Sequence, residues 1–497
     1  MDLVPHALDA VSARQKIGRG ELKPSVLLES YIDQIQTIDP VVNAMVTRSF
    51  DQARQQADIA DKAVVSGEKL GALHGLPVAI KDIQATKGIR TTYGSQAYSD
   101  HIPDIDAGIV SRIREAGGLI IGKTNVPESS IGANTVNRLF GATGNAFNPD
   151  LTCGGSSGGA GVAIATQMAA LATGSDHGGS LRIPACYSGV VGYRATPGTV
   201  PHETRTTLQT NYSVQGPMAR TVADCALLLS VIANRDKAAS KDPMAFPLQA
   251  SKFAQLDEVD ISQLKIAITP DLGGVMVSET IRDIFLERMA KLGNQVGQCD
   301  LHDISLSDAP DVDWHLRQDL FVTQYYEDAS SWDADFNPNV QATYKAALET
   351  SMSDIARARR RQVELFQSFR AIFESYDLVI CPGVSIPPFP WRDLNPRLID
   401  GKVVENYMAW LALTSSLTVV GHPVVALPCG LDRQSTPFGV QVVGPMYEDK
   451  KLLSIASALE GYFATEADLC RPIPNFQALA VTQSSCRSEG RNIFNAQ

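Results

Sequence analysis

Residues 153–182 read CGGSSGGAGVAIATQMAALATGSDHGGSLR and place two glycine-flanked serines, Ser156 and Ser180, 24 residues apart. The surrounding segment, residues 141–198, holds 13 of the 38 glycines of the chain in 58 of its 497 residues. Because glycine loses more conformational entropy on folding than any other residue, such a cluster indicates sharp turns or close backbone approaches. We therefore expect the chemistry of this protein to lie here.

Simple geometry predicts that the two serines meet. A helix of about nine residues starting at Gly158 would rise about 14 Å. An extended run of about five residues through Ala172 and Ser175 would return about 16 Å. The two lengths nearly cancel, so Ser180 would come back beside Ser156. Two adjacent hydroxyls surrounded by glycine N–H groups suggest a nucleophile, a proton relay and an oxyanion hole.

Other interpretations of this stretch fit poorly. Gly154–Gly158 matches the G-x-S-x-G pattern of a nucleophile elbow, but the preceding GNAFNPDLTC has turn chemistry where that motif needs a strand. The stretch 153–182 does not contain the P-loop pattern G-x-x-x-x-G-K-[ST]. A flexible linker would not continue into the apolar run AGVAIATQMAAL. The eight histidines are dispersed and no H-E-x-x-H occurs, so the sequence predicts no catalytic metal.

A serine nucleophile needs a base, and the sequence suggests a lysine kept neutral by burial. Lys81 follows HGLPVAI, a short strand that is apolar on both faces. Lys123 follows a similar strand that begins at Leu119. Burial alone does not separate the two lysines.

The fold class indicated by the sequence is α/β. Helical periodicity covers residues 24–38, 109–116 and 355–373. Strand signals lie at 74–83, 119–121, 264–268, 377–381, 424–428 and 438–443. Helical stretches separate most of these strands, and the first two are apolar on both faces, which is typical of a sheet covered on both sides. We therefore expect a largely parallel sheet.

The composition of the chain restricts the kinds of partner and the compartment that can be expected. The net charge is −11 and the isoelectric point is about 5.3, which argues against nucleic acid or an anionic membrane as the main partner. No signal peptide and no run of about 18 apolar residues is found. The eight cysteines are scattered without a CxxC pair, which fits reduced thiols in the cytoplasm. A cytoplasmic protein is the expectation.

The sequence closely resembles the amidase signature family of Ser-cisSer-Lys hydrolases. The resemblance rests on GGSSGG (154–159) and GSDHGGSLRIPA (174–185), and extends through LHGLPVAIKD, GKTNVPE, GPMARTVAD, YDLVICPG and FGVQVVGP. It covers residues 7 to 475 or so. It implies a single large domain, 1–476, built around a mixed, mostly parallel β-sheet with helices on both faces. Within it, residues 305–375 are expected to vary and to shape the substrate site. The remaining tail, 477–497, looks polar and loosely held.

The resemblance also implies roles for individual residues. Ser180 matches the nucleophile, Ser156 the bridging serine after a cis bond from Gly155, and Lys81 the base. Lys123 matches a second recurring lysine, for which a structural role is expected. The oxyanion hole would be formed by the backbone N–H groups of His177, Gly178, Gly179 and Ser180. Ser175 matches a supporting hydroxyl. Cys153 stands where proline or serine is common in the family, and we expect it to border the substrate.

The resulting hypothesis is a C–N hydrolase acting on a linear amide, a carbamate or an anilide, such as an aryl acylamidase or a urethanase. No cofactor is implied, the expected partner is the small-molecule substrate, and a homodimer is allowed. One alternative is the glutaminase component of a tRNA-dependent amidotransferase, which would need partner subunits. The other is a non-catalytic scaffold, which retention of Lys81, Ser156 and Ser180 disfavours.

Aromatic residues point to the substrate. Six aromatics fall between Trp314 and Phe336, against fewer than two expected from an aromatic content of 7%. Aromatic side chains commonly line ligand pockets. We therefore predict a bulky apolar or aryl substrate that contacts Tyr325, Tyr326 and Trp332.

Overall fold

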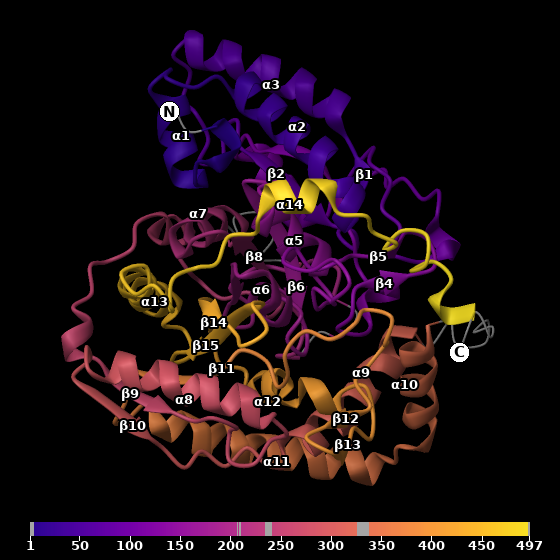
Figure 1. The fold of residues 1–497 in the computed structure, drawn as a ribbon, viewed down its shortest axis with the longest axis vertical. Helices are drawn as coiled ribbons and strands as arrows, with labels where there is room; N and C mark the ends of the chain where they lie inside the picture. Colours follow the sequence, from indigo (N-terminus) through magenta and orange to yellow (C-terminus); the bar gives the residue numbers. More distant parts are fainter. Residues whose placement is uncertain (1–3, 206, 208–209, 234–240, 326–336, 496–497) are drawn as a thin grey trace.

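The structure, a computed structural model, describes residues 4–205, 207, 210–233, 241–325 and 337–495. Its centre is one 11-stranded sheet (Figure 1). In spatial order the strands are β1 (Met45–Arg48), β3 (Leu119–Thr124), β2 (Pro77–Lys81), β6 (Leu171–Asp176), β8 (Val214–Ala219), β7 (Val191–Arg194), β14 (Val424–Leu431), β15 (Pro437–Val443), β11 (Leu378–Pro382), β9 (Lys265–Ile268) and β10 (Gln298–Leu301). Two small hairpins complete the strands: β4 (Val136–Asn137) with β5 (Gly141–Ala142), and β12 (Leu398–Ile399) with β13 (Lys402–Val403).

Helices surround this sheet. They are α1 (Ala10–Gly18), α2 (Pro24–Val42), α3 (Phe50–Val65), α4 (Gly108–Glu115), α5 (Gly158–Ala165), α6 (Arg182–Ser188), α7 (Val222–Ile232), α8 (Glu279–Gly293), α9 (Ala309–Tyr325), α10 (Pro338–Glu349), α11 (Met352–Ile372), α12 (Ala412–Val420), α13 (Asp449–Phe463) and α14 (Phe476–Val481). Figure 1 shows α1–α3 at one end of the molecule and α8, α10 and α11 at the other. None of the helices in the described part of the chain is long and apolar enough to cross a membrane.

The six strands and three helices expected from the sequence are all present within a few residues of the predicted bounds. Every residue of β2, β8, β7, β11 and β15 is buried. Because successive side chains of a strand point to opposite faces, complete burial means that both faces of the sheet are covered. One hydrophobic core runs from Ala10 to Leu479. The expected mixed α/β sheet in a single domain is therefore confirmed.

The expectation of a mostly parallel sheet is wrong. Of the ten strand pairs in the described sheet, six are antiparallel: β1–β3, β6–β8, β8–β7, β7–β14, β14–β15 and β15–β11. The parallel pairs lie toward the two ends, at β3–β2–β6 and β11–β9–β10. A central strand is apolar on both faces whichever way its neighbours run, so the hydrophobic pattern does not reveal strand direction.

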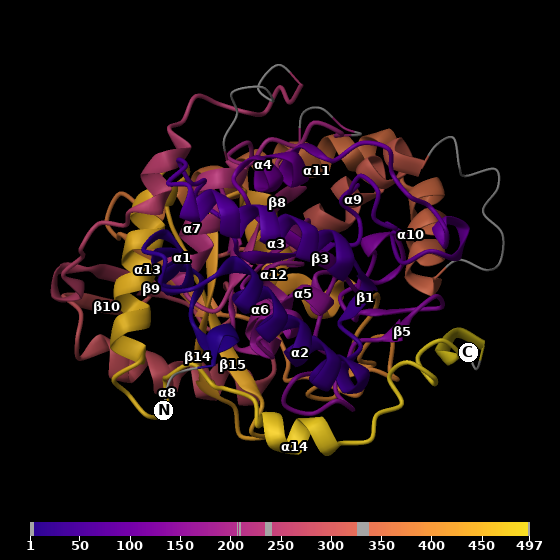
Figure 2. The same ribbon diagram turned by 90° about the horizontal axis from the view of Figure 1, so that it is seen from above.

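The C-terminal tail is held more firmly than its polar composition suggests. Helix α14 packs against α2, as both views show (Figures 1 and 2). Beyond it, Cys486 and Phe494 are 1% and 9% exposed and join a small hydrophobic cluster with Trp391. The Arg392 guanidinium donates to Glu489 and Ser485 of the tail. The expectation of a loosely held tail is therefore wrong, because apolar residues separated by polar ones anchor it.

Candidate active site

One lysine and two serines from distant parts of the chain meet at the carboxyl ends of strands β2 and β6. Lys81 Nζ lies 2.8 Å from Ser156 Oγ and 2.8 Å from Ser175 Oγ. Lys81 is fully buried and Ser156 is 1% exposed. The Gly155–Ser156 peptide bond is cis, as predicted. The structure therefore brings together Lys81, Ser156 and Ser175, which the sequence analysis selected.

The local folding that achieves this follows the predicted geometry. Strand β2 ends at Lys81 and pairs in parallel with β6, so Ser175 near the end of β6 emerges at the same edge. Ser156 lies in the turn just before α5, and the chain returns from α5 along β6. The sequence GVAIA in α5 is buried on every side, which fixes this helix between the sheet and α6.

Ser180 lies in the turn between β6 and α6 and lines the same cavity as Ser156 and Ser175. Its carbonyl accepts a hydrogen bond from the Ser157 N–H at 3.2 Å, which ties the two glycine-rich turns together. The Ser180 hydroxyl makes no side-chain hydrogen bond within the described part of the chain. Catalytic contacts are often longer in a free enzyme than in its substrate complex.

The two buried lysines differ in the groups that they contact. Burial lowers the pKa of Lys81 to about 7, against a weaker opposing effect of the Asp176 carboxylate. Burial also lowers the pKa of Lys123, but the Lys123 ammonium donates to the Gln84 carbonyl and to Thr86 Oγ1. Only Lys81 contacts the serines. These contacts make Lys81 the better candidate of the two lysines for the base.

Asp176 is the central charged residue of the turn that carries Ser180, and the sequence analysis missed it. Its two carboxylate oxygens accept hydrogen bonds from the Gly179 and Leu181 amides and from the guanidinium groups of Arg182 and Arg194, at 2.9 to 3.3 Å. Asp176 and both arginines are fully buried. Burial opposes ionisation of Asp176, but Arg182 and Arg194 outweigh it and hold the pKa well below its ordinary value. This cluster fixes the backbone of residues 176–182.

Replacing Asp176 by asparagine should therefore destabilise the fold. The change leaves two buried arginines without their counter-charge, which costs roughly 3–5 kcal/mol. We expect the free energy of unfolding, measured by denaturant titration, to fall by about that amount. The matched control is Asp150→Asn, because Asp150 pairs with Arg392 at the surface, where an ion pair contributes less than about 1 kcal/mol. Equal effects of the two substitutions would contradict this account.

The backbone of residues 177–180 was predicted to form an oxyanion hole, and the structure refines this expectation. Gly179 has a φ of +127°, which favours glycine, and a Cβ there would collide with Thr414 Oγ1. The Gly179 N–H donates to Asp176 Oδ1 at 2.9 Å, so this amide already has a partner. The Gly178 carbonyl, in the same peptide unit as the Gly179 N–H, accepts from Thr414 Oγ1 at 2.7 Å, so both polar groups of this unit have partners. The amides of His177, Gly178 and Ser180 are the remaining donors.

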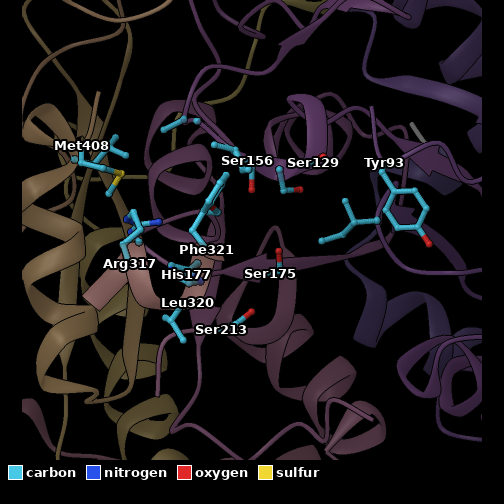
Figure 3. Close-up of a pocket in the computed structure, with 18 of the residues that line it drawn as sticks. Tyr93, Ser129, Ser156, Ser175, His177, Ser213, Arg317, Leu320, Phe321 and Met408 are labelled. Carbon is cyan, nitrogen blue, oxygen red and sulfur yellow. The ribbon is translucent and has the colours of Figure 1, made fainter. Parts of the chain in front are cut away.

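A cavity of about 450 Å³ opens beside these residues. Figure 3 shows Ser156 and Ser175 near its middle, with Arg317 and Met408 to one side and Tyr93 to the other. One part of its wall is apolar and consists of Leu320, Phe321, Tyr407, Met408 and Leu411. Another part is polar and includes His202, Thr204, Arg205, Thr207, Thr210 and Ser213. The cavity can therefore hold a substrate much larger than acetamide.

Some predicted substrate contacts are not in this wall. Cys153 is fully buried and does not line the cavity, and burial raises the pKa of its thiol. The expectation that Cys153 borders the substrate is wrong, because its side chain points into the core below the turn. Tyr326, Trp332 and the side chain of Tyr325 lie outside the described residues. In the described part of α9, Arg317, Leu320 and Phe321 line the cavity instead.

Metal-ligating side chains do not gather in the part of the chain that the structure describes. No group there of three or more histidine, cysteine, aspartate or glutamate side chains could hold a metal ion.

Comparison with known proteins agrees with the motifs. The family model described as Amidase matches residues 26–453. The chain is 30% identical over 464 residues to an acylamidase of Rhodococcus erythropolis, covering 92% of this chain and 95% of that protein. It is 31% identical over 468 residues to one of the subunits of a glutamyl-tRNA(Gln) amidotransferase from Clostridium acetobutylicum, covering 88% and 95%. Among solved structures, a bacterial aryl acylamidase of the amidase signature family superposes with a TM-score of 0.84 at 24% identity, covering 96% and 99%.

Proposed function

Since this chain belongs to the amidase family, whose members include amidase-type hydrolases, we propose that it hydrolyses linear amides through an acyl-enzyme on Ser180. The observation that carries the proposal is the contact of Lys81 Nζ with Ser156 Oγ and Ser175 Oγ, combined with the lowered pKa of Lys81. A lysine with a pKa of about 7 is half neutral at that pH and mostly neutral about one pH unit above it, so it can act as a base.

The proposed reaction has two stages, acylation of Ser180 and hydrolysis of the acyl-enzyme. Neutral Lys81 takes the proton of Ser156, and Ser156 takes the proton of Ser180 while the Ser180 Oγ–carbon bond forms. The tetrahedral intermediate then collapses, the carbon–nitrogen bond breaks, and Ser156 returns a proton to the leaving nitrogen. Lys81 then returns its proton to Ser156. In deacylation Ser156 takes a proton from the attacking water and passes its own to Lys81, the Ser180 Oγ–carbon bond breaks, and the carboxylic acid leaves. Ser180 regains its proton from Ser156, which Lys81 reprotonates.

The negative oxygen of the tetrahedral intermediate needs donors that are fixed in advance. We assign this role to the amides of His177, Gly178 and Ser180, with Gly179 holding the turn through Asp176. Burial, followed by the charges of Arg317 and Arg194, lowers the pKa of His177 well below its ordinary value, so its side chain is neutral. The His177 ring therefore adds no full charge beside the intermediate.

For the substrate we propose a bulky apolar or aryl amide. The apolar wall of the cavity supports this choice, since aromatic and aliphatic side chains bind such groups through large contact area. Residues Tyr325, Tyr326 and Trp332 remain predicted contacts.

Phe321→Ala tests the substrate class. Phe321 is 7% exposed and lines the cavity. Its loss should raise KM for an aryl amide about tenfold more than KM for acetamide, because acetamide is too small to reach the ring. Phe366→Ala is the control, since Phe366 packs on His422 away from the cavity wall. Equal losses on both substrates, or the same ratio in the control, would contradict the assignment.

The amidotransferase relatives support a second candidate function, the glutaminase component of such an enzyme. The decisive experiment is a screen of the purified chain alone on aryl amides, alkyl amides, carbamates and glutamine. Our proposal expects turnover of aryl amides without partner subunits. Faster turnover of glutamine than of any anilide, or activity that appears only with partner subunits, would favour the second candidate instead.

A further inference from the structure

Arg317 is an under-used hydrogen-bond donor in the wall of the proposed substrate cavity. A guanidinium carries five N–H donors. Within the described part of the chain, Arg317 Nη2 donates to Asp313 at 3.3 and 3.4 Å, which is long, and the guanidinium also interacts with the Tyr407 hydroxyl. Its Nε is buried without a partner among the described residues. Arg317 therefore keeps donor capacity for a ligand.

The second arginine of the cavity shows the contrast. Arg205 donates through Nε to Asp242 at 2.9 Å and through Nη1 to the Ser213 carbonyl at 3.1 Å. Asp242 is fully buried, so Arg205 is held in the wall by a good ion pair. Arg205 Nη2 is also buried without a partner among the described residues, but Nε and Nη1 of Arg205 are held at ordinary hydrogen-bond distances, whereas both contacts of Arg317 with Asp313 are long.

Arg317 also lies close to the reacting atoms. A Cβ built on Gly178 would lie 2.8 Å from Arg317 Nη2, so the guanidinium covers the middle of the proposed oxyanion segment. Asp313 behind it is 1% exposed. Burial disfavours the charged form of Arg317, but Asp313, Tyr407 and Tyr212 together outweigh this effect and raise the pKa, so Arg317 keeps its charge. The side chain is 12% exposed, enough to meet a ligand in the cavity.

The direction of the substrate follows from the proposed relay. Ser156 delivers the proton to the leaving nitrogen, so the leaving group lies on the Ser156 side of the cavity. In Figure 3 Arg317 and Met408 lie on the other side of Ser156 from Ser129 and Tyr93. The acyl group of the substrate therefore extends toward Arg317.

We propose that Arg317 binds an anionic oxygen on the acyl part of the substrate, so that the preferred substrates are amides of dicarboxylic acids with one free carboxylate. This inference rests on the proposed function for the direction of the substrate. Arginine suits the role because its planar N–H groups match a carboxylate in geometry and charge. The apolar residues Leu320 and Met408 beside Arg317 would contact the methylene groups between the two carbonyl carbons.

The test measures binding, so it does not depend on turnover. In a Ser180→Ala background, calorimetry compares three anilides: N-phenylsuccinamate, N-phenylbutyramide and 4-butyramidobenzoate. The first carries a carboxylate on the acyl side, the second carries none, and the third carries it on the leaving group. We expect the succinamate to bind at least about tenfold more tightly than the butyramide. The benzoate should gain nothing.

Arg317→Gln should reduce the succinamate preference to less than about threefold, while Arg317→Lys should restore part of it. Because Arg317→Gln leaves Asp313 buried and unpaired, the double variant Asp313→Asn/Arg317→Gln serves if the single variant does not fold, and should show the same loss. Arg205→Gln is the matched control and should keep the preference.

Three outcomes would overturn the assignment: equal affinity for succinamate and butyramide, a preference that survives removal of Arg317, or a preference that disappears with Arg205 instead. The proposed function and the role of Arg317 would be refuted by different results. If the unmodified protein hydrolyses no anilide, amide hydrolysis of this class is refuted whatever the binding constants are. If it hydrolyses butyramide and succinamate anilides equally and binds them equally, only the role of Arg317 is refuted.

Discussion

Ser180→Ala should lower kcat for amide hydrolysis by about 10⁴-fold or more. Removing the nucleophile of a serine hydrolase leaves only the catalysis that the oxyanion donors and substrate positioning supply. The fold should be unaffected, because the Ser180 hydroxyl makes no side-chain hydrogen bond in the described residues. We expect the melting temperature to change by no more than about 2 °C. Initial rates with an aryl amide and a thermal melt measure the two quantities.

Ser188→Ala is the matched control for this substitution. Ser188 is a fully buried serine of α6, and its hydroxyl is unpaired among the described side chains. Its loss removes a hydroxyl of the same kind from the helix that follows Ser180 and should leave kcat within about threefold. A Ser180→Ala enzyme that keeps more than about a hundredth of the activity would contradict the assignment of the nucleophile.

Lys81→Ala should lower kcat by roughly 10³- to 10⁴-fold, because general-base catalysis typically contributes about 10²- to 10⁴-fold. Lys81→Arg should not restore activity, since a guanidinium stays protonated and cannot accept the proton of Ser156. The unsubstituted enzyme should lose activity as the pH falls through about 7, the pKa to which burial lowers Lys81. Activity falls in this direction because Lys81 is protonated below that pH and cannot accept a proton, whereas above it Lys81 is neutral.

Lys123 provides the comparison for this prediction. It is as deeply buried as Lys81, but its ammonium is bound by Gln84 and Thr86. Lys123→Gln should therefore reduce stability while the remaining activity keeps its inflection near the lowered pKa of Lys81, about 7. The account is contradicted if kcat/KM shows no inflection within about one pH unit of that value, or if the inflection is lost in Lys123→Gln and retained in Lys81→Ala.

Much of the site could be predicted from the sequence, because its essential parts are local. The apolar run between Ser156 and Ser180 has room for one short helix and one strand, and these are α5 and β6. The resemblance of GGSSGG and GSDHGGSLR to a known family supplied the cis bond, which is present. The lysine beside the serines could not be chosen by burial alone, since Lys81 and Lys123 follow strands of the same character.

What the sequence could not supply depends on contacts between distant segments. Thr414 reaches the Gly178 carbonyl across 236 residues, and the Arg182 side chain meets Gln441 across 259. No local pattern encodes such pairs. Asp176 could have been noticed as an acid inside a glycine-rich apolar segment, since a buried carboxylate needs a buried cation. Arg182 and Arg194 were available as candidates, but the partnership is visible only when β6, β7 and α6 are packed together.

The central claim is that the acyl group of the substrate is transferred to Ser180. The most direct measurement is mass spectrometry of the protein after reaction with an aryl N-alkylcarbamate, a substrate class whose acyl-enzyme is hydrolysed slowly. The bond from Ser180 Oγ to the carbamoyl carbon forms, the bond to the phenol oxygen breaks, and the phenol leaves with the proton. We predict one added carbamoyl group per chain, located by peptide mapping at Ser180 and absent from Ser180→Ala. An adduct on Ser156 or Ser175, or phenol release by the intact enzyme at an undiminished rate in Ser180→Ala, would contradict the account.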